Sequence, residues 1–215
     1  MEQSNFTELK GRLINMGLIS NGTTLLDAGA IDSGIAQGPM QLITTLTASS
    51  SANLSFTSGI SSTYKEYVFV FFNLHPANNG VEFEFQGNAA GASGFNETIT
   101  SSLFKAGHGE DDSSSSLNYE ADHDQSQGTG FQDIARYVGN GNDESVCGTL
   151  TLYDPSSTAF VKHFIARTQM YHASNEAEDC FTAGYFNTTA AIDEIQFKFS
   201  AGNIDTGTIK MYGIK

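Results

Sequence analysis

The polar stretch from residue 107 to residue 130 contains the largest group of side chains that could bind a metal ion or transfer a proton. Calcium sites use several carboxylate and carbonyl oxygens, which makes the acidic residues of this stretch candidate ligands. These residues are Glu110, Asp111, Asp112, Glu120, Asp122 and Asp124. The D-x-D-x-D-G pattern of a calcium loop is absent, and a run of serines separates the two acidic groups. We therefore expect a solvated acidic surface and no bound metal.

The histidines are the next candidates for chemistry, and they are His75, His108, His123, His163 and His172. His123 lies between two aspartates and resembles half of an acid–base pair. The sequence contains neither a G-x-S-x-G nucleophile motif nor the His and Cys spacing of a zinc site. His163 falls in the run FVKHFIAR, where a position on a strand face is expected. We therefore expect a protein that is not an enzyme, with no catalytic residue and no cofactor.

Carbohydrate binding is a separate possibility, because aromatic side chains on loops can stack on sugar rings. Tyr119, Tyr171 and Tyr185 could serve in this way, although tryptophan, the usual platform, is absent. The polar loops at 105–130 and 171–179 would then form the binding region. A host-receptor or glycan-binding module of a tail fibre is therefore the alternative to a purely structural role.

The charge of the chain argues against several classes of partner. The sequence has 24 acidic and 10 basic residues, a formal net charge of −14. Such a chain does not suit a nucleic acid or an anionic membrane, which require clustered basic residues. No apolar run approaches the ~20 residues of a spanning helix, and no secretory signal begins the chain. We expect synthesis in a cytosol and free thiols at Cys147 and Cys180, while a bridge between them stays open.

The distribution of apolar residues predicts a mainly β structure. Tyr64–Leu74 is apolar on both faces and predicts a central strand covered on both sides. Val81–Gln86 alternates and predicts an antiparallel neighbour of that strand, and two runs within 192–215 predict a closing hairpin. The other expected strands are 41–47, 53–56, 95–104, 117–119, 131–138, 146–153, 159–168 and 181–187. About ten strands joined by tight turns predict one jelly-roll-like antiparallel β-sandwich over residues 41–215.

The first 40 residues form a separate predicted region. Residues 4–17 predict a short helix, and the Gly-rich residues 18–40 predict an extended arm. Their apolar side chains are the candidate partner-binding residues: Phe6, Leu9, Leu13, Met16, Leu25, Leu26 and Ile31. Both segments could pack on the β-domain of the same chain or on a neighbouring subunit, and the sequence leaves this choice open.

Three stretches of the chain resemble a group of small β-rich virion proteins of tailed bacteriophages, especially marine ones. They are FTSGISSTYKEYVFVFFNLHPANNGVEFEFQ, LTLYDPSSTAFVKHFIART and AGYFNTTAAIDEIQFKFSAGNIDTGTIKMYGIK, about half of residues 56–215. The resemblance implies a structural protein on the particle exterior, either a capsid decoration or a tail appendage component. It implies location in the virion after synthesis in the host bacterial cytoplasm, with other virion proteins as partners. We expect attachment through residues 1–40 and a homo-oligomer, with a trimer favoured.

Overall fold

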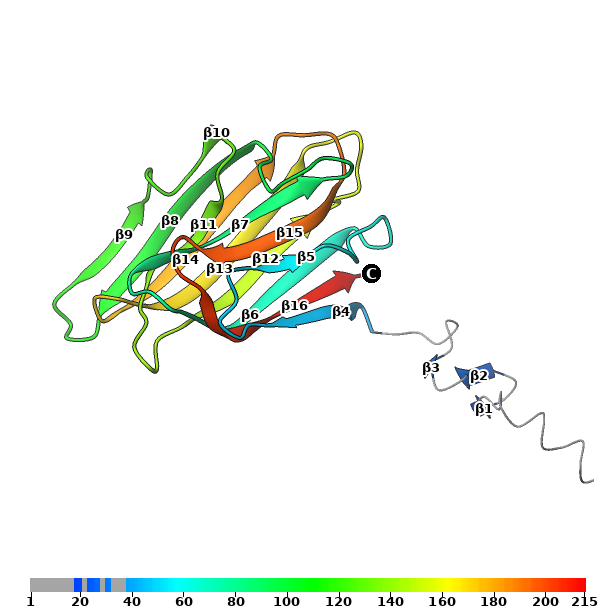
Figure 1. Cartoon of the computed structure of the whole chain (residues 1–215), viewed down its shortest axis with the longest axis horizontal. Helices are drawn as coiled ribbons and strands as arrows, with labels where there is room; N and C mark the ends of the chain where they lie inside the picture. Colours follow the sequence, from blue (N-terminus) through cyan, green and yellow to red (C-terminus); the bar gives the residue numbers. More distant parts are fainter. Residues whose placement is uncertain (1–17, 21–22, 28–29, 32–37) are drawn as a thin grey trace, which may run out of the picture. The chain divides into compact units, whose positions relative to one another are not determined.

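The computed structural model describes residues 18–20, 23–27, 30–31 and 38–215 (Figure 1). The chain divides into two compact units, Met1–Pro39 and Met40–Lys215. The helix predicted over residues 4–17 lies outside the described residues.

Three short strands occupy the described part of the first unit, where the sequence predicted an extended arm. They are β1 (Leu18–Ser20), β2 (Thr23–Asp27) and β3 (Ala30–Ile31). They form one antiparallel sheet in the order β1-β2-β3, in which Leu26 is the register partner of both Leu18 and Ile31. A small paired sheet therefore replaces the unpaired arm over these residues.

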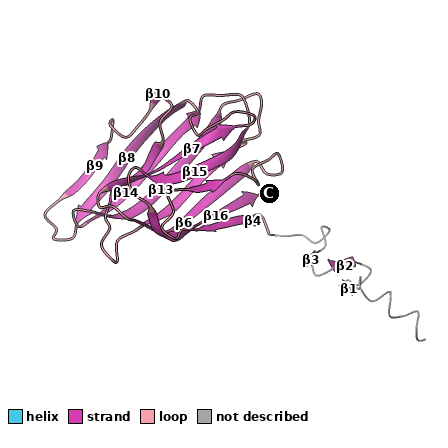
Figure 2. Cartoon of the chain, viewed as in Figure 1, coloured by secondary structure: helices cyan, strands magenta, loops and turns pink. Residues whose placement is uncertain are grey.

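All regular structure in the described residues is strand, as Figure 2 shows. The second unit contains β4 (Met40–Thr47), β5 (Leu54–Phe56), β6 (Glu66–Pro76), β7 (Val81–Ala89), β8 (Ile99–Gly109), β9 (Ser115–Tyr119), β10 (Ser126–Gly128), β11 (Gln132–Val138), β12 (Val146–Tyr153), β13 (Lys162–His172), β14 (Glu176–Phe186), β15 (Ile192–Phe199) and β16 (Ile204–Ile214). The all-β class predicted from the sequence is confirmed for this part of the chain.

The strands of the second unit belong to one antiparallel, 13-stranded sheet that is nearly closed like a barrel. Its larger part has the order β4-β16-β6-β12-β13-β14-β8-β9, with β10 also paired to β8, and its smaller part has the order β11-β7-β15-β5. The pairing of Val138 with His172 links β11 to β13 and so joins the two parts. Because the sheet is continuous, the predicted sandwich of two separate sheets is not confirmed.

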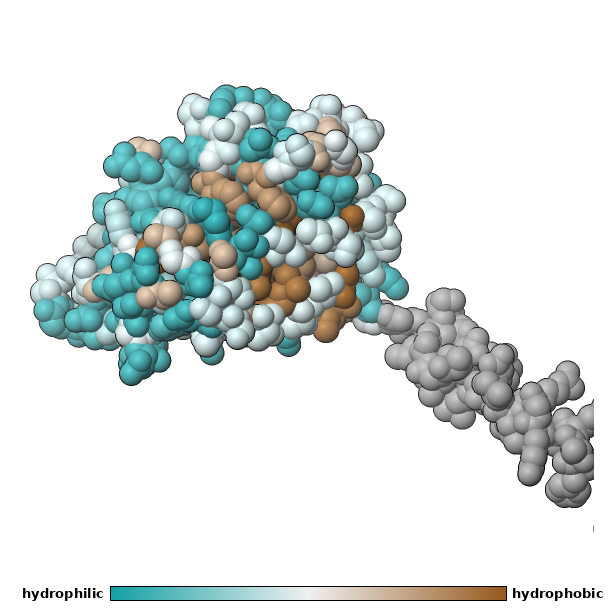
Figure 3. Space-filling model, in the orientation of Figure 1, coloured by the Kyte–Doolittle hydropathy of each residue, from teal (hydrophilic) through white to brown (hydrophobic). Residues whose placement is uncertain are grey.

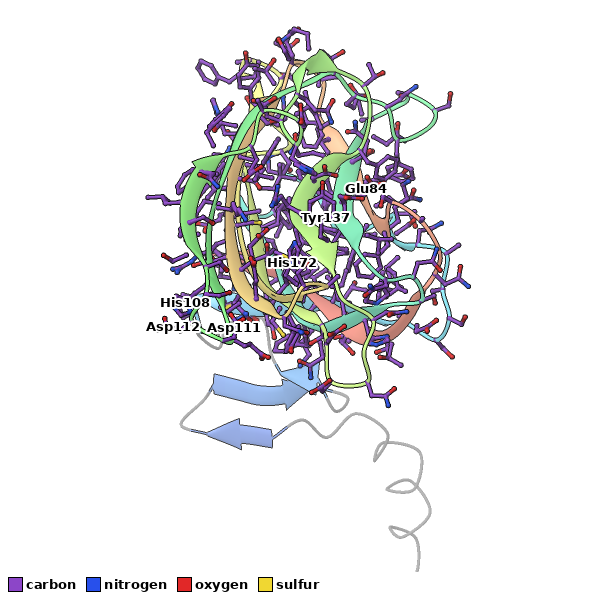
Figure 4. The ribbon with its side chains drawn as sticks, turned by 90° about the vertical axis from the view of Figure 1, so that its left-hand side faces the viewer. Glu84, His108, Asp111, Asp112, Tyr137 and His172 are labelled. Carbon is purple, nitrogen blue, oxygen red and sulfur yellow. The ribbon has the colours of Figure 1, made fainter. Side chains whose placement is uncertain are left out.

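The smaller part lies across the larger one, and aromatic side chains fill the space between them (Figures 1 and 4). Tyr67, Phe69 and Phe71 alternate along β6 and are fully buried. The ring of Phe71 lies 5.2 Å from that of Phe83 on β7 and 5.2 Å from that of Phe197 on β15. Burial of such large apolar surfaces is the main favourable term that holds the two parts together.

Two predicted hairpins are wrong, because consecutive strands cross between the parts. β6 pairs with β16 and β12, whereas β7 pairs with β11 and β15. Likewise, β15 pairs with β7 and β5, whereas β16 pairs with β6 and β4. A short turn and two alternating runs are compatible with a hairpin or with a crossover. The Phe71 and Phe83 rings meet across the core from strands that do not pair with each other, so the crossover buries both rings between the two parts.

The predicted polar loops contain more strand than the sequence indicated. β14 begins at Glu176, inside the predicted loop at 171–179, and β8 continues to Gly109. β9 includes the short strand predicted at 117–119, and β10 was not predicted at all. The sequence of these segments does not alternate between apolar and polar residues, because their inward positions include charged residues such as Glu178, which is fully buried. Apolar periodicity cannot detect a strand whose buried side is ionic.

The two-sided burial predicted for the strand at residues 64–74 is also wrong. β6 is central in the pairing order, but only its inward side is buried. On its other side Val68 and Val70 are half-buried and Phe72 is 42% exposed. The apolar residues of this side therefore face outward, with no layer of the second unit covering them.

Candidate functional site

A cluster of buried charges lies between β8 and β14 of the larger part and β11 of the smaller part. The Glu178 carboxylate has no exposed surface and accepts hydrogen bonds from Lys105 Nζ at 2.8 Å and from Arg136 Nε at 2.9 Å. Arg136 also donates from a terminal nitrogen to Glu120 Oε2 at 2.7 Å. We call Lys105, Glu120, Arg136 and Glu178 the charged cluster. It is the largest group of paired ions within the described residues.

The electrostatics of the charged cluster keep Glu178 ionised. Burial by itself would raise the pKa of this carboxyl group, because a charge loses its hydration in the interior. The hydrogen bonds and positive charges of Arg136 and Lys105 outweigh burial, so the pKa of Glu178 lies below its ordinary value. Both carboxylate oxygens are engaged with these cations, so the arrangement positions strands and does not present a free base.

His123 does have an acidic partner, but not one of its sequence neighbours. Its Nδ1 lies 2.7 Å from Asp133 Oδ2, and this hydrogen bond raises the pKa of His123. The imidazole also packs edge-on against the Tyr137 ring at 5.7 Å. Figure 4 shows Tyr137 near His172, and their ring centres are 5.5 Å apart. The Gln132 side-chain amide donates a hydrogen bond of 2.9 Å to the His123 carbonyl oxygen and holds the same loop in place. His123, predicted as half of an acid–base pair, thus links the loop between β9 and β10 to β11 through its hydrogen bond with Asp133.

The other acidic candidates are not brought together. Glu110, Asp111 and Asp112 are exposed at the β8–β9 turn, where Asp112 Oδ1 lies 3.2 Å from His108 Nε2. Figure 4 shows His108, Asp111 and Asp112 at the edge of the larger part, away from Tyr137 and Glu84. Asp124 instead accepts a hydrogen bond from the Tyr119 hydroxyl. Within the described residues no group of three or more acidic, His or Cys side chains is arranged to hold a metal ion.

The two cysteines point to opposite sides of the larger part and are both free. Cys147 is half-exposed on β12 and bonds to Asn73, whereas Cys180 is buried on β14. Burial raises the pKa of the Cys180 thiol, so it remains protonated. Because the two thiols lie on opposite sides of the larger part, they do not form a bridge with each other.

A second feature, which the sequence reasoning missed, is the outward side of the larger part. Among the described residues ten large apolar side chains are exposed, and eight of them project from this side. These eight are Met40, Leu42, Phe72, Phe104, Leu117, Tyr119, Tyr153 and Ile165. We call this side the outer apolar face. Exposed apolar side chains gathered on one side of a sheet are typical of an interaction site.

The centre of the outer apolar face is hollowed. Phe104 on β8 and Phe181 on β14 stack in parallel at 4.8 Å, and the Arg167 guanidinium lies 4.7 Å above the Phe181 ring. These side chains, with Ile165 and Ala183, line a mostly apolar hollow of about 320 Å³. A second hollow of about 460 Å³ lies beside it, lined by residues that include Tyr153, Phe160 and His163.

The outward side of the smaller part is different in character. Glu82, Glu84, Asp133 and Glu194 project from it, opposed by Lys198. Burial raises the pKa of Glu84, although its oxygen lies 2.6 Å from Lys198 Nζ. Figure 3 shows that hydrophilic residues cover most of the face seen there, with hydrophobic residues in a patch at its upper middle and in another toward β16 and β4. The outward side of the smaller part thus carries mainly acidic and polar side chains, several of them buried, whereas that of the larger part carries exposed apolar ones.

The partner-binding residues predicted from the sequence all lie in the first unit. Leu25 and Leu26 are in β2, and Ile31 is in β3. Phe6, Leu9, Leu13 and Met16 lie outside the described residues. The sequence did contain an indication of the outer apolar face, namely the run at 64–74, which is apolar on both sides. We interpreted this run as a strand covered by other elements on both sides.

Comparisons with protein-family models, with curated proteins and with solved structures find no match for this chain. In the described part of the chain, no helix is long and apolar enough to cross a membrane.

Proposed function

We propose that this protein is a non-enzymatic structural component of the exterior of a tailed-phage virion, attached to other virion proteins through its first 39 residues. It would serve as a capsid decoration or as part of a tail appendage, after synthesis in the host bacterial cytoplasm. The observation that carries the proposal is the division of the chain into two units at Pro39 and Met40. A separate N-terminal unit allows an attachment segment to bind a neighbour without disturbing the second unit.

The chemistry of the second unit supports a role based on shape. The titratable groups that gather inside it, in the charged cluster, bond to one another and hold strands together. Its core consists of interlocking aromatic rings. An acidic outer surface limits non-specific association with other acidic particles.

The test is deletion of residues 1–39 in the phage genome. The deletion stops before Met40, because Met40 is the first residue of β4 and pairs with Ile214. We expect the truncated protein to fold and remain soluble but to be missing from purified particles. Incorporation of the truncated protein at normal occupancy would show that attachment does not use the N-terminal unit.

A glycan-binding module of a tail fibre is the second candidate, favoured by one observation on β9. Tyr119 is 58% exposed and bonds to the Asp124 carboxylate, and Leu117 beside it is 72% exposed. An exposed ring next to a carboxylate suits stacking on a sugar and bonding to its hydroxyls. Binding of the purified protein to host cells should then decrease in a Tyr119→Ala variant, whereas a decorating protein should show no such binding.

A further inference from the structure

We propose that the outer apolar face is a self-association surface, on which a second copy of this chain packs face to face about a two-fold axis. This inference goes beyond the virion role and does not depend on it, because pairing would occur in the purified protein. We infer that the partner is a second copy from the charges, the shape and the area of the outer apolar face.

Charge favours a second copy over an oppositely charged partner. The outward positions of the paired strands in the larger part carry four charged residues: Glu66, Arg167, Asp179 and Lys210. Two are acidic and two are basic, and Arg167 is already bonded to Asp179 at 2.7 Å. The whole chain has a formal net charge of −14, so most of its surface repels an identical copy. The outer apolar face is the region where two copies can approach without accumulating charge.

The loop between β12 and β13 adds Phe160 to the eight strand residues of this side, so the same face carries a projection and a hollow. Phe160 is 72% exposed and lies with outward-facing Tyr153 and His163 around the second hollow. The hollow at Phe104 and Phe181 measures about 320 Å³, and a cavity of about 150 Å³ is known to accept a benzene ring. The hollow is open to solvent and has room for the Phe160 ring of a second copy, which we propose as its occupant.

Hydrogen bonds with Lys162 and Ser157 hold the loop that carries Phe160 in position. The Phe160 carbonyl accepts a hydrogen bond of 2.6 Å from the Nζ of Lys162, a buried residue that also donates to the Thr188 carbonyl at 3.3 Å. The Phe160 amide donates to Ser157 Oγ at 3.3 Å. A projection that is already ordered loses little conformational entropy on binding, which favours a role as an anchor residue.

The position of the projection and the hollow sets the symmetry. Since both are on one face, a face-to-face contact is isologous, and each Phe160 enters the hollow of the other copy. The predicted assembly is thus a two-fold pair and not the trimer favoured from the sequence. Eight strands about 4.8 Å apart, with about six residues each at about 3.3 Å, span roughly 700 Å². A stable interface buries about 800 Å² per partner, so the pair would have to cover nearly the whole face together with the Phe160 loop.

The first experiment measures the oligomeric state of the full chain by sedimentation velocity over a range of concentrations. We expect a concentration-dependent dimer. Ile165→Glu places a carboxylate in the centre of the contact and should raise the dimer dissociation constant at least about 100-fold. Phe160→Ser should raise it about 10- to 100-fold. Gln196→Glu adds the same charge on the opposite, polar side and should leave the dimer unchanged.

A cross-linking experiment tests the two-fold geometry. Chains carrying Phe160→Cys are mixed with chains carrying Ala183→Cys under mild oxidation. We expect a covalent heterodimer from the mixture and none from wild-type protein, in which Cys147 and Cys180 remain. A strictly monomeric wild-type protein at about 100 µM, a trimer, or a dimer insensitive to Ile165→Glu would each overturn the proposal. These outcomes are independent of particle incorporation, which tests the virion role separately.

Discussion

The space between the two parts of the sheet is filled in two different ways. At β6, β7 and β15 it contains aromatic rings, among them Phe71, Phe83 and Phe197, with centres 5 to 6 Å apart. At β8, β14 and β11 it contains the charged cluster, in which each ion has a partner within 3 Å. The aromatic region is held by desolvation, which does not depend on pH near neutrality, whereas the charged cluster depends on the ionisation of Glu178.

The comparison shows that burial alone does not identify a reactive site. Glu178 is as inaccessible as Phe197, yet its charge is balanced by two cations from other strands, which engage both of its carboxylate oxygens. The predictions below separate the two regions by the size of their effects and by their response to pH.

The largest effect is expected from Phe197→Ala. Phe197 contacts Phe56, Phe69, Phe71, Phe83 and Phe85, so its removal leaves a cavity at the centre of the aromatic region. We expect a loss of about 4 kcal/mol in the free energy of unfolding. Urea denaturation at pH 4 and at pH 7 should give the same loss. Phe160→Ala, at an exposed ring, is the matched control and should change stability little.

Glu178→Gln should cost about 3 kcal/mol at pH 7, because Lys105 and Arg136 would be left buried without their anion. The folded-state pKa of Glu178 is lowered, so its contribution is present above the ordinary pKa of about 4.5. That contribution is lost as the pH falls through the lower folded-state value. The difference between wild type and variant, measured by urea denaturation, should therefore narrow on acidification. A difference that stays constant with pH would contradict the assigned ionisation.

His123→Gln should have a smaller effect of opposite pH dependence. Because the bond to Asp133 raises the pKa of His123, its contribution is complete below the ordinary pKa of about 6.5. The contribution decreases as the pH rises through the folded-state value. We expect a loss of about 1 kcal/mol at pH 5.5 and less at pH 9, measured by thermal unfolding. A larger loss at pH 9 than at pH 5.5 would show that the imidazole is neutral in the pair.

Lys65→Ala should have the smallest effect. Lys65 Nζ lies 2.8 Å from Asp154 Oδ1, but its side chain is 77% exposed. Exposed ion pairs contribute at most about 1 kcal/mol, so a change of less than about 0.5 kcal/mol is expected in the same assay. A loss comparable to that of Glu178→Gln would mean that burial is not what distinguishes the charged cluster.

Local patterns predicted the strands well where one side is apolar and the other polar. The strand expected at 146–153 coincides with β12, and the turn after it leads to a returning strand, β13, that pairs with β12 as expected. Strands with charged inward residues were predicted less well. The strand that corresponds to β14 was expected to begin at residue 181, whereas β14 begins at Glu176, in a segment interpreted as a loop. The position of His163 on a strand face was also predicted correctly, and the structure adds that its side chain is exposed.

The sequence by itself determined the all-β class, because alternating Phe, Ile and Val residues separated by turn formers leave few other ways to bury apolar surface. Only the tertiary structure decided which strands pair, since short turns permit a hairpin or a crossover. It also decided that Lys105, Arg136 and Glu178 meet and that the apolar side of β6 remains uncovered. Those outcomes depend on contacts between residues distant in the chain, which no local pattern records.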